Sequence, residues 1–446
     1  MTLKKIYINT FGCQQNEADS ETLLGIAESK GYQYTENAEE ADCIVFNTCA
    51  VREHAELKAL SNTGKLKHLK KQNPNLKIGI CGCMVQQEHR KEDIKQKYPY
   101  VDFVFGTNQI SRFGEILDQI QTAKKRLFLV ESYDENPGTI REGLPIKRKF
   151  SHRAYVSVMY GCNNFCTYCV VPYVRGRERS REPECILAEV RSLIQKGYKE
   201  IMLLGQNVNS YGKDLKNPFN FSKLLQSICE IEGDFVVRFM TSHPKDATEE
   251  LFDTIANNPK CERHFHLPLQ SGSDAILKAM NRRYNMETYY KLCDMLRNKI
   301  PGITITTDLI VAFPGETEED FQKTLEAVER CRFDNIFTFV YSPRKGTPAA
   351  AMENQIPDSV AKERMARLLA LHQKNQLENN RNMVGKTVRA LCDGISKTDC
   401  NIYSAYSQNG KLIHFKASGK EDPVGRFVRL RITDAHAITL IGEEVL

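Results

Sequence analysis

The chain has 446 residues, of which 41% are hydrophobic and 26% charged, and a formal net charge of +6. This composition is typical of a globular protein of two to four domains and excludes fibrous and disordered classes. The opening MTLKKIYINTFGC has no apolar signal segment and no run reaches the length of a membrane span, so we expect a cytoplasmic protein with no membrane partner.

Short runs rich in β-branched and aromatic residues alternate with helical stretches over residues 1–132. The predicted strands are KKIYINTFGC, ADCIVFNTCAV, LKIGICGCM and VDFVFG, and the predicted helices are SETLLGIAESKGY and HAELKALSNTGKLKHLKK. Alternation at this spacing predicts a parallel α/β domain. Residues 133–149, rich in Gly, Pro and charge, follow as a predicted linker whose final KRK is expected to be solvated surface.

Residues 150–380 carry six further predicted strands, AYVSVMYG, EIMLLGQ, FVVRFMTS, HFHLPLQ, TITTDLIVAF and IFTFVYS. Six β/α units are too few for a closed eight-unit barrel, so we expect an open, partial (β/α)6 barrel. After a long polar helix, residues 381–446 hold about five short strands, a pattern typical of a small OB-like β-barrel. The predicted fold class is therefore α/β, with three domains.

Three of the fifteen cysteines lie in YGCNNFCTYCVVPYVRGRERSR, directly after the first predicted barrel strand. Cys162, Cys166 and Cys169 have C-x3-C-x2-C spacing, with no fourth cysteine or histidine in the loop. A disulfide framework is disfavoured in a reducing cytosol, which leaves metal ligation. The alternative is zinc, but a structural zinc ion usually has four protein ligands. An iron–sulfur cluster with one open iron is therefore the better explanation. Five other cysteines lie in apolar stretches and are expected to be ordinary buried residues: Cys43, Cys185, Cys229, Cys293 and Cys331.

A C-x3-C-x2-C motif at the start of a partial α/β barrel resembles the radical S-adenosylmethionine (SAM) superfamily. The resemblance implies that SAM occupies the open iron of a [4Fe–4S] cluster and is cleaved to a 5′-deoxyadenosyl radical. It also implies SAM contacts at strand ends, where this sequence has Tyr168, Gly205, Gln206 and Asp308. For each of these four residues alone, a packing or turn role is an equally good explanation. No residue is identified as a catalytic acid or base.

A second set of cysteines lies in the predicted N-terminal domain. Cys13, Cys49 and Cys83 each follow a different predicted strand, at the carboxyl edge of one parallel sheet, where such sheets bind ligands. Cys43 opens its strand at the opposite edge. Cys81 still belongs to the apolar run, whereas Cys83 lies beyond a glycine that lets the backbone turn. We therefore predict Cys13, Cys49 and Cys83 as ligands of a second metal group, with scattered structural cysteines as the alternative.

Seven segments together resemble the methylthiotransferase family of radical SAM enzymes, in order and over essentially the whole chain: FGCQQNEADSE, NTCAVREHAE, GICGCMVQ, YGCNNFCTYCVVPYVRGRERSR, HLPLQSGSD, AFPGETEEDF and YSPRKGTPAA. The resemblance implies an N-terminal methylthiotransferase domain with an auxiliary [4Fe–4S] cluster, a radical SAM core with its own [4Fe–4S] cluster, and a C-terminal TRAM domain that binds tRNA. NTCAVREHAE resembles the variant found in the branch of the family that adds a methylthio group to C2 of N6-isopentenyladenosine 37 in the tRNA anticodon stem-loop. The other implied partners are an electron donor such as flavodoxin or ferredoxin and a sulfur or cluster donor.

Basic residues offer two further hypotheses. Four arginines follow the first triad: Arg175, Arg177, Arg179 and Arg181. They could contact SAM or anticodon-loop phosphates, but surface charge or helix capping is an equally good explanation. Aromatic and basic residues in the C-terminal barrel suit base stacking and phosphate contact, with about half of the aromatics expected in the barrel core: Tyr403, Tyr406, Phe415, Lys416, Arg426 and Arg429.

The sequence leaves two alternative functions open. One is a methylthiotransferase of the same family that acts on N6-threonylcarbamoyladenosine 37 of tRNA. The other is a non-enzymatic iron–sulfur sensor that binds RNA, which would need neither a partial barrel nor a second cysteine triad.

Overall fold

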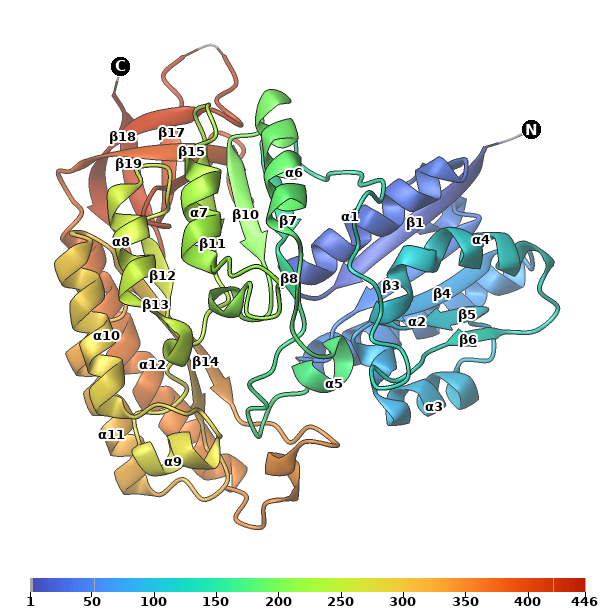
Figure 1. Ribbon diagram of the computed structural model, residues 1–446, viewed down its shortest axis with the longest axis horizontal. Helices are drawn as coiled ribbons and strands as arrows, with labels where there is room; N and C mark the ends of the chain where they lie inside the picture. The colour runs from blue at the N-terminus through green and yellow to red at the C-terminus, as the bar shows by residue number, and fades with distance from the viewer. Residues whose placement is uncertain (1–2, 52, 420, 446) are drawn as a thin grey trace.

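The computed structural model describes residues 3–51, 53–419 and 421–445 (Figure 1). The N-terminal part is a six-stranded parallel sheet of order β2-β1-β3-β4-β5-β6. Its strands are β1 (Lys4–Phe11), β2 (Tyr32–Tyr34), β3 (Cys43–Thr48), β4 (Lys77–Gly82), β5 (Phe103–Phe105) and β6 (Leu127–Leu129). Its helices are α1 (Gln14–Ser29), α2 (Glu53–Gln72), α3 (Glu88–Lys97) and α4 (Phe113–Thr122), with 3-10 turns η1 (Ala38–Glu40), η2 (Met84–Gln86) and η3 (Thr107–Arg112).

Helices cover both faces of this sheet, as the unbroken burial of β3 requires. Alternate residues of β3 point into different hydrophobic cores. Ile44 and Phe46 pack in one core, and Cys43 and Val45 pack in the other. The predicted parallel α/β domain is thus confirmed. The three-residue edge strands β2 and β6 were missed because neither is long enough to carry a periodic signal. The first helix begins at Gln14, six residues before the predicted start.

The central part is the predicted open barrel. Two parallel sheets, β11-β10-β7 and β12-β13-β14, are linked by a bridge between Val237 and Cys261. Its strands are β7 (Arg153–Ser157), β8 (Met159–Tyr160), β9 (Arg179–Ser180), β10 (Glu200–Leu204), β11 (Val236–Phe239), β12 (His264–His266), β13 (Thr304–Val311) and β14 (Asn335–Val340). Its helices are α5 (Val171–Arg175), α6 (Pro183–Gln195), α7 (Phe221–Cys229), α8 (Glu249–Asn257), α9 (Asp274–Ala279), α10 (Met286–Lys299), α11 (Glu318–Cys331) and α12 (Asp358–Arg381), with 3-10 turns η4 (Val208–Ser210), η5 (Pro244–Asp246) and η6 (Pro348–Ala351).

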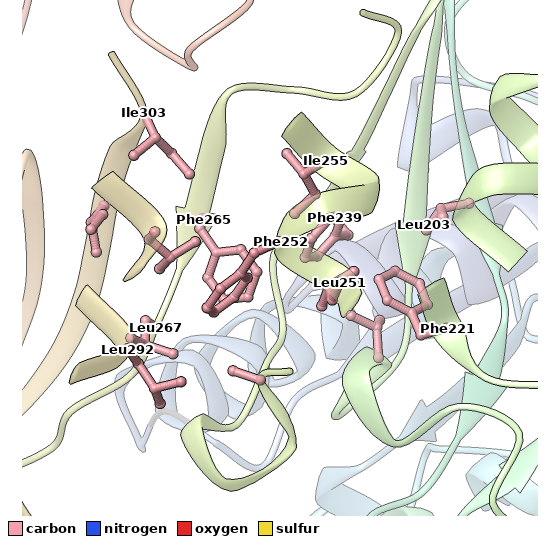
Figure 2. Packing of buried hydrophobic residues seen from close by; sticks show 14 of the residues in the cluster. Leu203, Phe221, Phe239, Leu251, Phe252, Ile255, Phe265, Leu267, Leu292 and Ile303 are labelled. Carbon is pink, nitrogen blue, oxygen red and sulfur yellow. The ribbon is translucent and has the colours of Figure 1, made fainter. Parts of the chain in front are cut away.

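One large hydrophobic cluster holds most helices of this part against its strands. Phe265 on β12 lies at its centre, with edge-on ring contacts to Phe239 at 5.7 Å and Phe252 at 5.4 Å (Figure 2). Leu251, from α8, packs beside them (Figure 2). Because α8 contributes both Leu251 and Phe252, it is fixed against the strands by apolar packing.

The C-terminal part is a closed barrel of order β15-β16-β17-β19-β18, which confirms the small β-barrel. Its strands are β15 (Thr387–Ile395), β16 (Tyr403–Ser407), β17 (Leu412–Lys416), β18 (Phe427–Ala435) and β19 (Leu440–Glu444). Of the aromatics predicted to face RNA, Phe415 is buried in the barrel core, Tyr403 packs against that core, and Tyr406 is 36% exposed. Within the described ranges, no helix is long and apolar enough to cross a membrane.

The barrel packs against the amino ends of the central strands. Lys411 bonds to Asp334, just before β14, at 2.6 Å, and Arg153, the first residue of β7, bonds to Asp393 at 2.7 Å. The backbone amide of Arg263, just before β12, donates to a barrel carbonyl. Figure 1 shows the barrel at the far end of these strands from α5. The C-terminal barrel is therefore an integral cap on the central part.

The core of the central part predicts how one substitution affects stability. Leu251 is 1% exposed, so Leu251→Ala should lower the free energy of unfolding by about 2–5 kcal/mol, through lost burial and the cavity left behind. Leu57, which is also helical but 52% exposed, is the matched control. Leu57→Ala should change the free energy of unfolding by less than about 0.5 kcal/mol. Urea denaturation followed by circular dichroism measures both. Equal effects of the two substitutions would contradict the packing in Figure 2.

Candidate active site

The three N-terminal cysteines lie together at the carboxyl edge of the first sheet. Cys13 follows β1, Cys49 follows β3 and Cys83 follows β4, and these strands are neighbours in the sheet. Cys13 and Cys49 lie close enough to Cys83 to act on its pKa. Gly82 permits the turn before Cys83: its φ is +99°, and a Cβ there would lie 2.3 Å from the Thr48 carbonyl oxygen.

Each of these three sulfurs has a polar contact. The Cys13 thiol donates to Asn16 Oδ1 at 3.4 Å, and the amide of Val51 donates to Cys49 Sγ at 3.3 Å. Cys83 Sγ accepts from Arg175 Nε at 3.2 Å. Arg175 is the last residue of α5, so the third contact comes from the central part of the chain.

A buried ion-pair network lies beneath the N-terminal cysteines. Asp19 on α1 has a fully buried side chain and pairs with Arg175 at 2.8 Å and with Arg141. Burial raises the pKa of Asp19, but Arg175 and Arg141 outweigh it and hold the pKa below its usual range. Arg141 belongs to the predicted linker, as does Arg148, which pairs with Glu21 at 3.0 Å and is only 10% exposed. The prediction of a solvated KRK is therefore wrong at Arg148.

The second cysteine set, Cys162, Cys166 and Cys169, lies within the loop between β8 and α5. Burial raises the pKa of Cys169 to about 12, with Cys166 and Cys162 adding to it. Cys166 Sγ accepts from Arg282 Nη1 at 3.3 Å. Within this loop Phe165 has a φ of +48°, a strained conformation for a non-glycine residue of the kind that clusters at functional sites.

The donor set of each triad is three cysteine thiols, the ligand type that holds iron–sulfur clusters. In the described part of the chain, no three His, Cys, Asp or Glu side chains converge tightly enough to hold a single metal ion.

Unsatisfied polar atoms lie at the carboxyl ends of the central strands. Asn207 Oδ1, both side-chain polar atoms of Asn209, and His243 Nε2 are buried without a hydrogen-bond partner among the described residues. Burial, with Arg282 next, lowers the pKa of His243, so its ring is neutral. An unpaired buried group costs about 1–3 kcal/mol, which a polar ligand would remove. These groups therefore fit a small polar molecule such as SAM beside the cysteines.

The structure places the four residues predicted to contact SAM as follows. Gly205 directly follows β10, and a Cβ there would lie 2.6 Å from Met159 Cγ. Gln206 Oε1 accepts the Gly161 amide, so it supports the turn before Cys162. Tyr168 Oη lies 3.5 Å from Arg282 Nη1.

Asp308, the fourth of these residues, is the fifth of eight residues in β13 and lies 3.5 Å from His266 Nε2. The expectation that it sits at a strand end is wrong. The SAM contacts of all four residues remain predictions.

Two of the four arginines after Cys169 have internal roles that the sequence did not indicate. Arg175 is 4% exposed, and Arg181 is 6% exposed and paired with Glu142 and Glu189 at 2.7 and 2.8 Å. The interpretation as surface charge is therefore wrong for Arg175 and Arg181, whereas contact with SAM or anticodon-loop phosphates stays a hypothesis. Arg177 is exposed and covers the Phe165 ring at 4.3 Å.

Sequence reasoning also missed Asp19, Arg141 and Arg282. Asp19 lies within FGCQQNEADSE and Arg282 within MNRRYN, among other charged residues. A charged residue on a helix or loop is usually solvated, so no signal separated these three from surface charge.

An open six-stranded barrel with a C-x3-C-x2-C loop after its first strand defines the radical SAM class, and residues 156–328 match the model of the Radical SAM superfamily. Residues 5–106 match the model described as Uncharacterized protein family UPF0004. The chain belongs to the tRNA-2-methylthio-N(6)-dimethylallyladenosine synthase family. Proteins of that name from Thermoanaerobacter pseudethanolicus and Alkaliphilus oremlandii are 51% and 50% identical to it, over 98% and 99% of this chain and 92% and 93% of theirs. One from Clostridium botulinum is 49% identical over 100% of this chain and 98% of its own.

Solved structures support the fold. The radical S-adenosylmethionine methyltransferase TsrM from Kitasatospora setae, solved with cobalamin and a [4Fe-4S] cluster, matches with a TM-score of 0.57 at 13% identity, over 78% of this chain and 77% of its own. The cobalamin-dependent S-adenosylmethionine radical enzyme OxsB matches at 0.52 and 12% identity, over 83% of this chain and 56% of its own. At this identity the likeness shows the architecture alone.

Thiol reactivity of the iron-free protein tests the burial of the cysteines. Burial raises the pKa of Cys83 and Cys169 to about 12, so at pH 8 their thiolate fraction is on the order of 1 in 10,000. Only the thiolate reacts, so alkylation of both should accelerate roughly 100-fold between pH 8 and pH 10. The two exposed cysteines, Cys13 and Cys400, should react first at pH 8. Peptide mass spectrometry after anaerobic iodoacetamide treatment measures each site.

The fully buried Cys43 reports unfolding in the same experiment, since it should stay unmodified while the fold is intact. Labelling of Cys83 as fast as Cys400 at pH 8, with Cys43 unmodified, would contradict this geometry.

Proposed function

We propose that this protein is a radical SAM tRNA methylthiotransferase that adds a methylthio group to C2 of N6-isopentenyladenosine 37. The observation that carries the proposal is the pair of cysteine triads, one in each of two adjoining parts of one chain. A sensor would need only one such site. The names of the full-length relatives support this activity and its substrate.

In this proposal Cys162, Cys166 and Cys169 hold one [4Fe–4S] cluster, and Cys13, Cys49 and Cys83 hold an auxiliary one. Each triad leaves one iron without a protein ligand. When bound, the first cluster supplies the electron that cleaves SAM, and the auxiliary one supplies an iron that can carry sulfur. The C2–H bond of adenosine resists acid, base and nucleophile, so radical chemistry suits this substitution.

The protein's own groups orient and isolate the reactants. Asn207 Oδ1, both polar side-chain atoms of Asn209 and His243 Nε2 are buried without a hydrogen-bond partner among the described residues, which suits bonds to polar groups of SAM. We assign Tyr168, Gly205, Gln206 and Asp308 to the same binding region. Arg282 donates to Cys166, and its further bonds to Pro268 O, Tyr284 and Tyr168 fix the guanidinium.

The domain roles complete the proposal. Residues 1–132 form the methylthiotransferase domain, 133–149 the connection, 150–380 the radical SAM core and 381–446 a tRNA-binding TRAM domain. An electron donor such as flavodoxin or ferredoxin and a sulfur or cluster donor would serve the reaction.

The two triads should have separable roles. Cys166→Ala should abolish 5′-deoxyadenosine formation from SAM, because it removes a ligand of the SAM-binding cluster. Cys49→Ala should still form 5′-deoxyadenosine but no methylthio product. Liquid chromatography with mass spectrometry measures both products, with tRNA carrying either isopentenyladenosine or threonylcarbamoyladenosine. Product from the second tRNA alone would favour the alternative substrate, and equal loss of cleavage in both variants would contradict two distinct sites.

Exposed cations on the C-terminal barrel should bind phosphates. Arg429 and Arg431 point outward from β18. Their double substitution by Ala should weaken tRNA binding about 10- to 100-fold at low salt, or about 1.4–2.7 kcal/mol. Each lost phosphate contact should reduce the slope of log affinity against log salt by about one. Titration at several salt concentrations measures the slope, and uncoupled SAM cleavage should not change.

A matched control removes the same kind of charge elsewhere. Lys65 and Lys67 are exposed on α2. Their double substitution by Ala should leave tRNA affinity within about twofold. Equal weakening by both double variants would mean that net charge, and not this barrel, governs tRNA affinity.

A further inference from the structure

Helix α5 joins the two cysteine triads. It begins two residues after Cys169 and ends at Arg175. Val170 and Val174 pack with Ala50 and Cys83 in one buried cluster. Ala50 is the neighbour of Cys49, so residues adjoining both triads share this cluster. The five-residue helix therefore reaches from one triad to the other.

The guanidinium of Arg175 is held rigidly at the far end of that helix. Nε donates to Cys83 Sγ at 3.2 Å and Nη2 donates to Asp19 Oδ2 at 2.8 Å. Arg141 occupies Asp19 Oδ1, and its Nη2 donates to the Thr107 carbonyl oxygen at 2.9 Å. With both carboxylate oxygens engaged, Arg175 has one orientation, directed at the sulfur.

The local charge is positive. Arg175 and Arg141 carry two charges that ordinary pH does not remove, and Asp19 carries one negative charge because its pKa is lowered. The three residues together therefore carry one net positive charge, and the member bonded to Cys83 is Arg175. Arg175 is 4% exposed, so water and salt screen its charge weakly.

Positive charge and hydrogen bonds at a cysteine sulfur raise the reduction potential of the iron–sulfur cluster that it binds. Net charge, hydrogen bonds to the sulfurs and solvent exposure set the reduction potential of an iron–sulfur cluster. Reduction adds an electron, so a buried cation bonded to a ligand sulfur stabilises the reduced form more than the oxidised form.

We propose that Arg175 is a positioning residue that raises the reduction potential of the auxiliary cluster through its hydrogen bond to Cys83. The inference rests on the proposed function, because it requires a cluster at Cys13, Cys49 and Cys83. It gives α5 a second role: the segment that follows the SAM-binding triad also sets the electron affinity of the other site.

The test measures the auxiliary cluster alone, in the full-length chain. Joint substitution of Cys162, Cys166 and Cys169 by Ala removes the other cluster and leaves about four irons per chain, the content of one cubane. Redox titration followed by electron paramagnetic resonance then gives the midpoint potential. In this background Arg175→Gln should make the cluster at least tenfold harder to reduce, a shift of about 59 mV for one electron. Arg175→Lys, which keeps the charge but loses the planar fork, should shift it less.

Arg141→Gln is the matched control, because Arg141 shares Asp19 but, among the described residues, donates to Asp19 and the Thr107 carbonyl and not to a cysteine. It should shift the potential less than Arg175→Gln. Equal shifts, or a change under twofold in Arg175→Gln, would overturn the role of the bond to Cys83. Loss of the cluster from both Arg175 variants while circular dichroism stays native would also overturn it, in favour of a purely structural role. Absence of iron from the background variant itself would contradict the proposed function instead.

Discussion

The arrangement of the candidate site depends on one buried ion-pair network, Asp19 with Arg141 and Arg175. Its three members come from α1, from residues 133–149 and from α5. Removing one partner of a buried pair leaves an uncompensated charge at a cost of about 3–5 kcal/mol. The N-terminal sheet, the connection and the central part are thus fixed to one another at the point where the two cysteine triads approach.

This network explains why residues 133–149, which form no helix or strand, are not a flexible connection. Residues 133–149 have turn composition, yet Arg141 and Arg148 are each 10% exposed and bonded to carboxylates of α1. Glu142 pairs with Arg181 from the central part. A flexible connection would let the distance between the triads vary, whereas ion pairs to both neighbouring parts hold it constant. In the proposed function one substrate meets groups from both sites, and a fixed distance between the sites keeps those groups oriented.

The sequence was sufficient for the longer strands and for the placement of the cysteines at the sheet edge, because both depend on local or edge geometry. Strong β-branched runs marked β1, β3, β4 and the six barrel strands, and the carboxyl-edge rule grouped Cys13 with Cys49 and Cys83. It was not sufficient for Arg175 or Arg282, whose partners lie 92 and 116 residues away along the chain. A buried arginine differs from a solvated one only through tertiary contacts, which local periodicity does not encode. Asp308 was misplaced for a related reason: β13 continues for three residues beyond it, through the apolar Leu309–Val311.

The position of the C-terminal barrel limits how tRNA can use it. The barrel packs on the amino ends of the central strands, whereas the cysteines of the radical site lie at the carboxyl ends. The eight residues of β13 alone span roughly 26 Å at about 3.3 Å per residue. In the proposed function, phosphates held by Arg429 and Arg431 cannot belong to the nucleotide that reacts. The barrel must instead hold a more distant part of the same RNA, so that binding energy gathered there positions the anticodon loop without crowding the cysteines.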